Sequence, residues 1–317
     1  MYAETDPYEP SARLESGPFQ GELIDSRHKR SIVQLPQEEA KKYQASPRNT
    51  VVANFYHEGK FWIAVIPHNA VKEVMLQKDQ FPSPIPAAHT QLRFTMKRGK
   101  GLKLFPQFGD HKPAESEVNE IVFSAEATMV QGDKYGVLKG MSGRFGVAYR
   151  LMSLKDSYLR IVYGPDHHVE QVKVKLKPSE RQAVLQRALQ LSHEKGMEDV
   201  YHTLCNSCTT TAFGVLDDTV KYGVLSKVGA LFDRIPVLPR TYLYLRGLIP
   251  LQDLIKNPTP SLEEEFAHWK NDEGLAKQWE KSLVEAQADA KAFEKFMSTR
   301  SSQSCSVFSR LLGKGSR

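Results

Sequence analysis

The sequence predicts an α+β fold in which an antiparallel sheet packs on helices and a helical extension follows at the C-terminus. Residues that alternate between apolar and polar, the pattern of strands, dominate the chain up to residue 176. Helical spacing over several turns begins at Pro178, and strands do not alternate with helices as in a parallel sheet. With 317 residues and 40% apolar content, the chain is long enough for a packed core.

Ordered structure is expected to begin near Thr50, after a loosely ordered polar lead-in over residues 1–48. Glu58-Gly59 marks a turn between two short strands. Residues 69–76 are compatible with a short helix, and the glycine-rich stretch 136–147 favours turns. The expected strands are two within 51–65, then 87–96, 120–128, 158–163 and 169–176.

Three helices follow. Pro178-Ser179-Glu180 opens the first, which runs to about His193, and Cys208 opens the second. Ser261 with Glu264 forms a capping box for a charged amphipathic helix to about Met297, interrupted near 271–274. The expected organisation is a lead-in (1–48), a catalytic domain (49–256), a helical extension (261–297) and a disordered basic tail (298–317).

The net charge of +6 is unevenly distributed. Residues 298–317 contain four cations and no acid, so the rest of the chain is almost neutral. Nucleic-acid binding usually needs a concentrated basic surface, and we therefore expect no nucleic-acid partner. The tail falls short of a dense polybasic cluster, which leaves peripheral contact with anionic lipid as a secondary option.

No run of about 20 apolar residues is present, and the first ten residues lack the features of a signal peptide. The chain as given is therefore expected to be cytoplasmic or to begin after a removed leader. Its three cysteines cannot build a disulfide framework, and two of them, Cys205 and Cys208, are three residues apart.

The segment 200–213, VYHTLCNSCTTTAF, has three interpretations: a redox pair, half of a zinc site, or a nucleophile. Zinc needs about four ligands, and neighbouring His167 and His168 on a strand point to opposite faces, so no metal site is expected. A redox pair usually follows a buried strand in a βαβ unit, which is not visible here. A thiol redox protein built on Cys205 and Cys208 stays open as an alternative.

Cys208 is followed by three threonines and an apolar helical face, which places its sulfur at the start of a helix. Free N–H groups and the helix dipole favour a thiolate at that position. His89 begins an alternating strand after a proline-rich approach, where it can serve as the proton acceptor. From the pattern alone, an ordinary strand-end histidine is favoured over a catalytic one.

A family resemblance bears on these residues. The strand AAHTQLRF, the segment VNEIVFSAEATM, the glycine-rich KGMSGRFGVAYRLMSLKDSYLRI and YHTLCNSCTTTAF together resemble the Lnb N-terminal periplasmic domain family over roughly residues 50–250. Those are bacterial, permuted papain-like proteins related to the NlpC/P60 group. The resemblance implies that Cys208 is the nucleophile and His89 the base, with the histidine preceding the cysteine along the chain.

Two positions depart from the family pattern. Ser207 precedes Cys208 where the family often has asparagine, and the asparagine here is Asn206. The family's strand asparagine corresponds to Ser124, so the residue that orients His89 is expected to be Glu126 or Asn119. The N–H of Cys208, with Tyr201 or Asn206, is the candidate oxyanion or substrate contact.

The expected function is cysteine-dependent acyl transfer, by an acyltransferase or hydrolase acting on ester or amide bonds. The resemblance implies a lipid, lipoprotein or cell-wall substrate in the bacterial envelope or periplasm, and no metal or organic cofactor. The alternative from another class is a non-catalytic papain-like binding module of the envelope.

Overall fold

The computed structural model describes residues 6–10, 13, 20–80, 88–109, 112–129, 140, 142–202, 207–220 and 239–288. The chain divides into two compact units, Met1–Ala267 and His268–Arg317. The first unit contains the sheet and every element discussed below except the second part of the C-terminal helical region.

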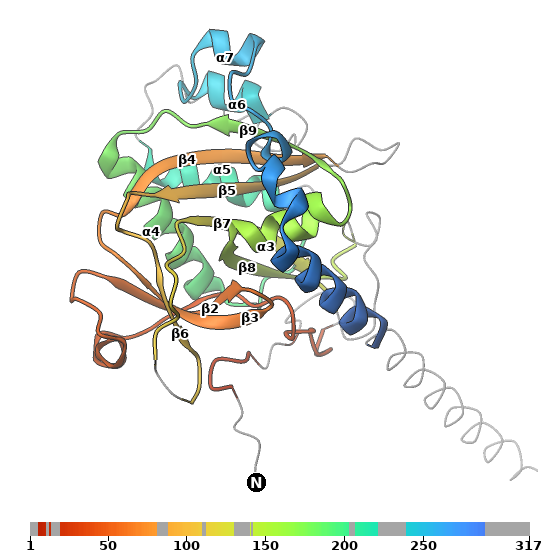
Figure 1. The fold of residues 1–317 in the computed structure, drawn as a ribbon. Coiled ribbons are helices and arrows are strands. Elements are labelled where there is room, and N and C mark those ends of the chain that lie inside the picture. The colour runs from red at the N-terminus through yellow and green to blue at the C-terminus, as the bar shows by residue number, and fades with distance from the viewer. Residues whose placement is uncertain are drawn as a thin grey trace, which may run out of the picture. The chain divides into compact units, whose positions relative to one another are not determined.

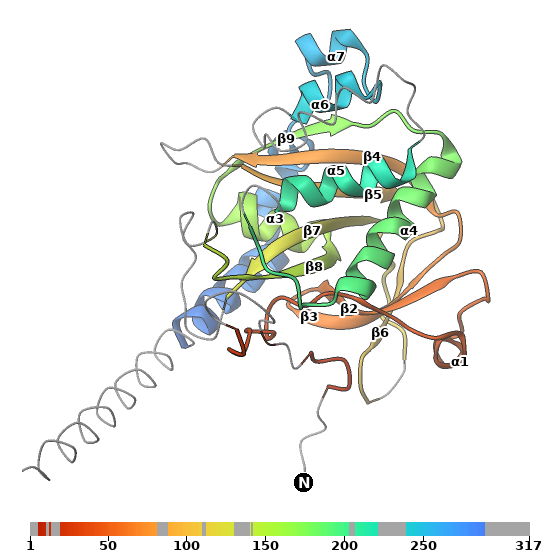
Figure 2. The same ribbon diagram turned by 180° about the vertical axis from the view of Figure 1, so that it is seen from behind.

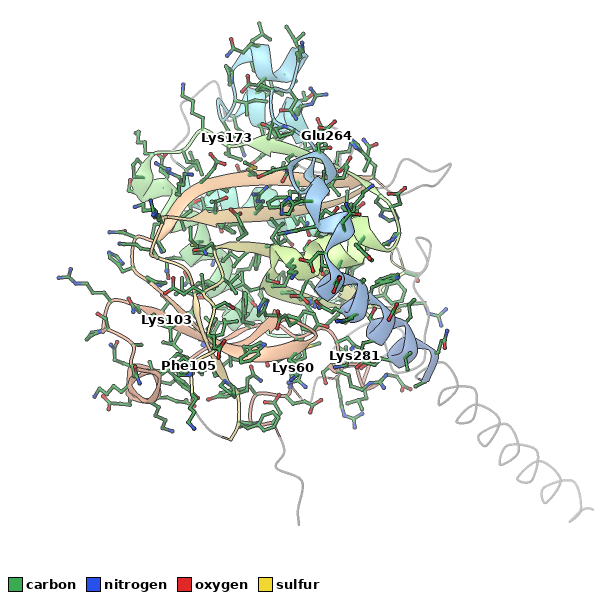
Figure 3. All side chains as sticks on the ribbon, in the orientation of Figure 1. Lys60, Lys103, Phe105, Lys173, Glu264 and Lys281 are labelled. Atoms are coloured by element: carbon green, nitrogen blue, oxygen red, sulfur yellow. The ribbon has the colours of Figure 1, made fainter. Side chains whose placement is uncertain are left out.

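A mixed sheet organises the first unit (Figure 1). Its order is β6-β3-β2-β8-β7-β5-β4-β9, with β1 beside β2. Figure 3 labels Lys103 and Phe105 on the edge strand β6 and Lys173 on the opposite edge strand β9. The strands are β1 (Val33–Gln34), β2 (Thr50–His57), β3 (Lys60–Ile66), β4 (Val71–Gln80), β5 (Ala88–Met96), β6 (Lys103–Pro106), β7 (Glu120–Thr128), β8 (Gly146–Ser153) and β9 (His168–Lys173).

The predicted antiparallel sheet needs one correction. All strand pairs in the described residues are antiparallel except β2 with β8, which run parallel and share the single register pair Tyr56↔Met152. The α+β class is therefore confirmed, and the sheet is mixed.

Helices cover both faces of the sheet. Figure 2 shows α4 (Pro178–Lys195) and α5 (Cys208–Thr219) lying across one face. The other face carries α3 (Leu154–Tyr158), which continues into η2 (Leu159–Tyr163). The remaining helices of the first unit are α1 (Gln37–Ala40), η1 (Lys41–Tyr43), α6 (Pro239–Leu245), α7 (Leu251–Ile255) and α8 (Leu262–Glu265).

The two faces of the sheet differ in polarity. On β5, Leu92 and Phe94 join the apolar core formed with α4 and α5. The alternate residues Gln91 and Arg93 are also buried, but they belong to a hydrogen-bonded polar layer. Gln91 Nε2 donates to Ser157 Oγ of α3 at 3.1 Å, and Arg93 pairs with Glu265 at 2.6 Å. Gln91 and Arg93 are thus hydrogen-bonded to other polar side chains of this layer.

Five strand predictions are confirmed. The two strands within 51–65 are β2 and β3, and the segments 87–96, 120–128 and 169–176 correspond to β5, β7 and β9. Glu58 and Gly59 both have positive φ, 49° and 74°, at the turn between β2 and β3. This conformation matches the twist of a two-residue hairpin.

Three local predictions are wrong. The expected helix at 69–76 is strand β4, because it pairs with β5 on one side and β9 on the other. The expected strand at 158–163 is helical, and its helix begins after Ser153, whose hydroxyl accepts from Asp156 N. Strand β8 was hidden by the glycine-rich stretch before it, and all eight of its residues are buried.

The helix starts at Pro178, Cys208 and Ser261 are confirmed. The Ser261–Glu264 capping box opens α8, and η4 (Ala267–Asn271) and helical residues 273–288 follow it, with a break at 272. The expected end near Met297 and the basic tail lie outside the described residues. Within the described part of the chain, no helix has the length and apolar character needed to cross a membrane.

Part of the predicted lead-in packs into the first unit. Ile32 and Tyr43 are buried in apolar clusters. Ser192 of α4 donates to the carbonyl of Tyr149 at 2.6 Å and accepts from the N–H of Ile32 at 2.9 Å. One hydroxyl therefore joins the lead-in, the sheet and α4.

Replacing Phe213 tests how strongly α5 is held. Its ring is fully buried and stacks on Tyr242 with centroids 3.7 Å apart. We expect Phe213→Ala to lower the free energy of unfolding by about 3–5 kcal/mol, measured by urea denaturation, because it leaves a cavity. The control Phe108→Ala, at a side chain that is 50% exposed, should change it by less than about 0.5 kcal/mol.

Candidate active site

Cys208 is the first residue of α5 and is buried. Ser207 precedes it in an extended conformation, and its N–H donates to Thr210 Oγ1 at 2.9 Å, which closes the first turn. The N–H groups of a helix's first turn have no carbonyl partner within the helix. The Cys208 sulfur therefore lies in the positive field of the α5 N-terminus.

The sheet opens next to this helix start. The register between β5 and β7 extends from Leu92↔Phe123 to Thr95↔Glu120, whereas β4 pairs with β5 as far as Gln80↔Ala88. At His89, β5 is therefore still paired with β4 but no longer paired with β7. The start of α5 lies against this open end, with Cys208 Sγ 4.0 Å from the carbonyl oxygen of Ala88.

A second contact fixes α5 on β5. Thr209 Oγ1 lies 3.0 Å from Thr90 Oγ1, and both side chains are buried. The backbone N–H of Thr90 also lowers the pKa of the Cys208 thiol. Strand and helix are therefore held in register at the position where Cys208 and His89 meet.

Cys208 and His89 are neighbours, and each acts on the pKa of the other. Burial alone would raise the pKa of the Cys208 thiol, but the neighbouring His89 and the N–H of Thr90 hold it below its ordinary value. Burial alone would lower the pKa of His89, but the Cys208 sulfur raises it. Both directions favour a thiolate–imidazolium pair.

Ser124 holds the other side of the imidazole. Its Oγ on β7 lies 2.7 Å from His89 Nε2, which leaves Nδ1 as the ring nitrogen for the thiol. When the imidazole is protonated, both ring nitrogens carry a proton, so Nε2–H donates to the Ser124 hydroxyl. The sequence analysis matched Ser124 to the strand asparagine of the family, but it expected Glu126 or Asn119 to orient His89.

Glu126, one of those expected residues, lies two positions along β7 from Ser124 and so shares its face. Its carboxylate binds Arg150 and Arg160, both at 2.9 Å. Burial would raise the pKa of Glu126, but Arg160 and Lys29 lower it to about 2. Glu126 is therefore ionised and acts on His89 through its charge, raising the imidazole pKa.

Asp79 of β4 is a further acidic neighbour that sequence reasoning missed. It is buried and lies opposite His89 in the β4–β5 register. Its Oδ1 is 2.9 Å from His167 Nδ1. Burial raises the pKa of Asp79, whereas the two histidines oppose that shift. Predicting a helix at 69–76 concealed the strand that carries this residue.

The other predicted site residues lie elsewhere or outside the described chain. Asn119 lies next to the far end of β5, where its carbonyl accepts from the N–H of Met96 at 2.8 Å. Tyr201 is packed in the apolar core, and its N–H donates to the Phe145 carbonyl at 2.7 Å. Asn206 and Cys205 fall outside the described residues, so their roles stay predictions.

The arrangement assembles the groups needed for nucleophilic catalysis: a sulfur with a lowered pKa, a histidine that can return a proton, and a helix N-terminus facing the reacting atom. Within the described ranges, no three histidine, cysteine or carboxylate side chains are grouped as ligands for a metal ion.

Thiol alkylation measures the pair directly. In a Cys205→Ser, Cys305→Ser background, we expect Cys208 to react with iodoacetamide with a midpoint below the ordinary cysteine pKa. Replacing His89 with glutamine should move that midpoint up by at least about one pH unit, because burial then outweighs the remaining stabilisation. The control His193→Gln should leave the midpoint unchanged; an equal shift in both variants would contradict the pairing.

One comparison with known proteins gives a match. A family model described as the Lnb N-terminal periplasmic domain matches residues 61–238, more than half of the chain. His89, Ser124 and Cys208 all fall inside the matched range. No curated protein and no solved structure matches the chain.

Proposed function

The chain belongs to the Lnb N-terminal periplasmic domain family, and from that premise we propose that it is a cysteine-dependent acyl-transfer enzyme. The observation that supports this most is the position of Cys208 at the start of α5, against the beginning of the strand that carries His89, where each of the two groups shifts the pKa of the other toward its charged form. The substrate class is an ester or amide of a lipid, lipoprotein or cell-wall component. The family's periplasmic description favours the bacterial envelope as the location.

In the first half-reaction, the Cys208 thiolate attacks the substrate carbonyl and forms a C–S bond. The carbonyl electron pair moves onto oxygen, where the N–H of Cys208 at the start of α5 stabilises the negative charge. When the carbonyl re-forms, the bond to the leaving oxygen or nitrogen breaks. His89 gives that atom its proton, and a thioester remains on Cys208.

In the second half-reaction, neutral His89 takes a proton from the acceptor as it attacks the thioester. Water gives a hydrolase, and an amine or alcohol gives an acyltransferase. When the carbonyl re-forms, the C–S bond breaks and the acyl group stays on the acceptor. Cys208 leaves as the thiolate and His89 keeps the proton, so the enzyme regains its starting protonation. Ser124 keeps the imidazole in one orientation through both steps.

The same proposal extends to the fold, which we infer to be permuted papain-like. Three observations support it: the histidine precedes the cysteine along the chain, the cysteine begins a helix, and that helix packs on the strand that carries the histidine. The mixed sheet is compatible with this assignment.

Trapping the acyl-enzyme tests the proposed activity. Incubation with an envelope extract, followed by mass measurement, should reveal an adduct on the peptide containing Cys208. Cys208→Ala should lose it, and His89→Gln should slow its formation at least about 100-fold, because general acid–base catalysis contributes that much. Cys205→Ser should retain it. Loss of activity in Cys205→Ser with an intact Cys208 adduct site would instead indicate a two-cysteine redox cycle.

Ser124 provides a separate test of how His89 is held. We expect Ser124→Ala to lower kcat by at least about tenfold with a smaller change in KM, because the imidazole loses its Nε2 partner at 2.7 Å. Ser124→Thr, which keeps the hydroxyl, should recover most of the rate. An equal loss in both variants would show that the hydroxyl itself does not matter.

A further inference from the structure

Three cations converge on Glu126 beside the proposed active site. Lys29 Nζ lies 3.3 Å from its carboxylate, and Arg150 and Arg160 each approach to 2.9 Å. The cluster therefore carries an excess of two positive charges. A further carboxylate that acts on Lys29, Asp25, is itself paired with Arg27 at 2.7 Å.

Burial of these charges is energetically unfavourable. Arg150 is only 1% exposed, and its Nε and Nη2 atoms have no hydrogen-bond partner. Its guanidinium lies over the Tyr56 ring at 5.0 Å, which compensates only part of the desolvation. Each buried donor without a partner lowers the stability of the folded protein. In addition, burial and the neighbouring Arg160 lower the pKa of Lys29, although Glu126 opposes that shift.

This cation cluster adjoins His89. Arg150 lies opposite Ser124 in the β7–β8 register, and Ser124 is the residue that contacts the imidazole. Glu126 at its centre changes the pKa of His89. The side chains of Arg160 and Lys29 stay 36% and 26% exposed. An anion can thus reach Arg160 and Lys29 from solvent. It would then be bound next to Ser124, the residue that contacts His89.

We propose that Lys29, Arg150 and Arg160 form a subsite for the phosphate group of a glycerophospholipid acyl donor. This inference rests on the proposed acyl-transfer function and names its substrate class. A phosphate carries up to two negative charges and several acceptor oxygens, which matches an excess of two cations and the forked donors of arginine. A carboxylate would neutralise only half of that excess.

Such a donor transfers one of its acyl groups to Cys208. The Cys208 thiolate attacks the ester carbonyl, the ester C–O bond breaks, and the acyl group stays on sulfur as a thioester. The departing glycerol oxygen takes the proton from His89 and leaves as a lysophospholipid. The cation cluster binds the phosphate throughout and holds the ester over the sulfur.

Binding to the inactive protein tests the subsite without any chemistry. In full-length Cys208→Ala, we expect glycerol 3-phosphate to bind saturably by calorimetry and to bind more weakly at high salt. Adding Arg160→Gln should weaken binding by about tenfold, the effect of losing a hydrogen bond to a charged group. Adding Arg187→Gln, an arginine paired with Asp218 at 2.8 Å elsewhere on the surface, should not change it.

Substrate preference provides the second readout. The ratio of kcat/KM for a phosphatidylglycerol vesicle to that for diacylglycerol should fall about tenfold in Arg160→Gln and stay constant in Arg187→Gln. Equal binding of glycerol 3-phosphate by both variants, an unchanged ratio, or tighter binding of glutarate than of glycerol 3-phosphate would overturn the subsite. Failure to trap an adduct on Cys208 while glycerol 3-phosphate still binds would overturn the enzymatic function and leave the binding site standing.

Discussion

The contact between the Cys208 sulfur and the His89 imidazole is the interaction on which the site depends. Cys208 is buried and His89 is half-buried, and the removal of water by itself would favour the neutral thiol and the neutral imidazole. The imidazolium of His89 favours the Cys208 thiolate, and the thiolate favours the imidazolium. The start of α5 adds a favourable field for the thiolate. Helix α5, the open end of β5 and β7, and the Thr90–Thr209 contact serve to keep these two groups together.

A second constraint arises from having both sheet faces buried. One face is apolar and packs on α4 and α5, while the other carries a polar layer in which charges must find partners. Arg93 forms ion pairs with Glu120 and Glu265. Glu126 forms ion pairs with Lys29, Arg150 and Arg160. The imidazole of His89 lies between the carboxylates of Asp79 and Glu126, so its protonation follows the charge balance of the whole layer.

The sequence placed Cys208 at a helix start and His89 on a strand, and the family resemblance paired them, but neither predicted their surroundings. Cys208 could be placed because a helix start is a local signal, and His89 because its strand alternates clearly. The orienting contact from Ser124 depends on how β5 and β7 diverge, and the role of Asp79 depends on β4 lying between two strands. Strand β8 was missed for a similar reason: burial on both faces removes the alternation that identifies a half-buried strand.

The parallel contact of β2 with β8 divides the sheet mechanically. A single register pair, Tyr56↔Met152, connects the four-strand group of β6, β3, β2 and β1 to the five-strand group that contains His89 and Ser124. Such a seam can yield before the long antiparallel ladders on either side. His89 and Ser124 lie on the same side of this seam, whereas Arg150, stacked on Tyr56, spans it. Slippage there would move the Tyr56 ring relative to Arg150 while leaving the contact between His89 and Ser124 in place.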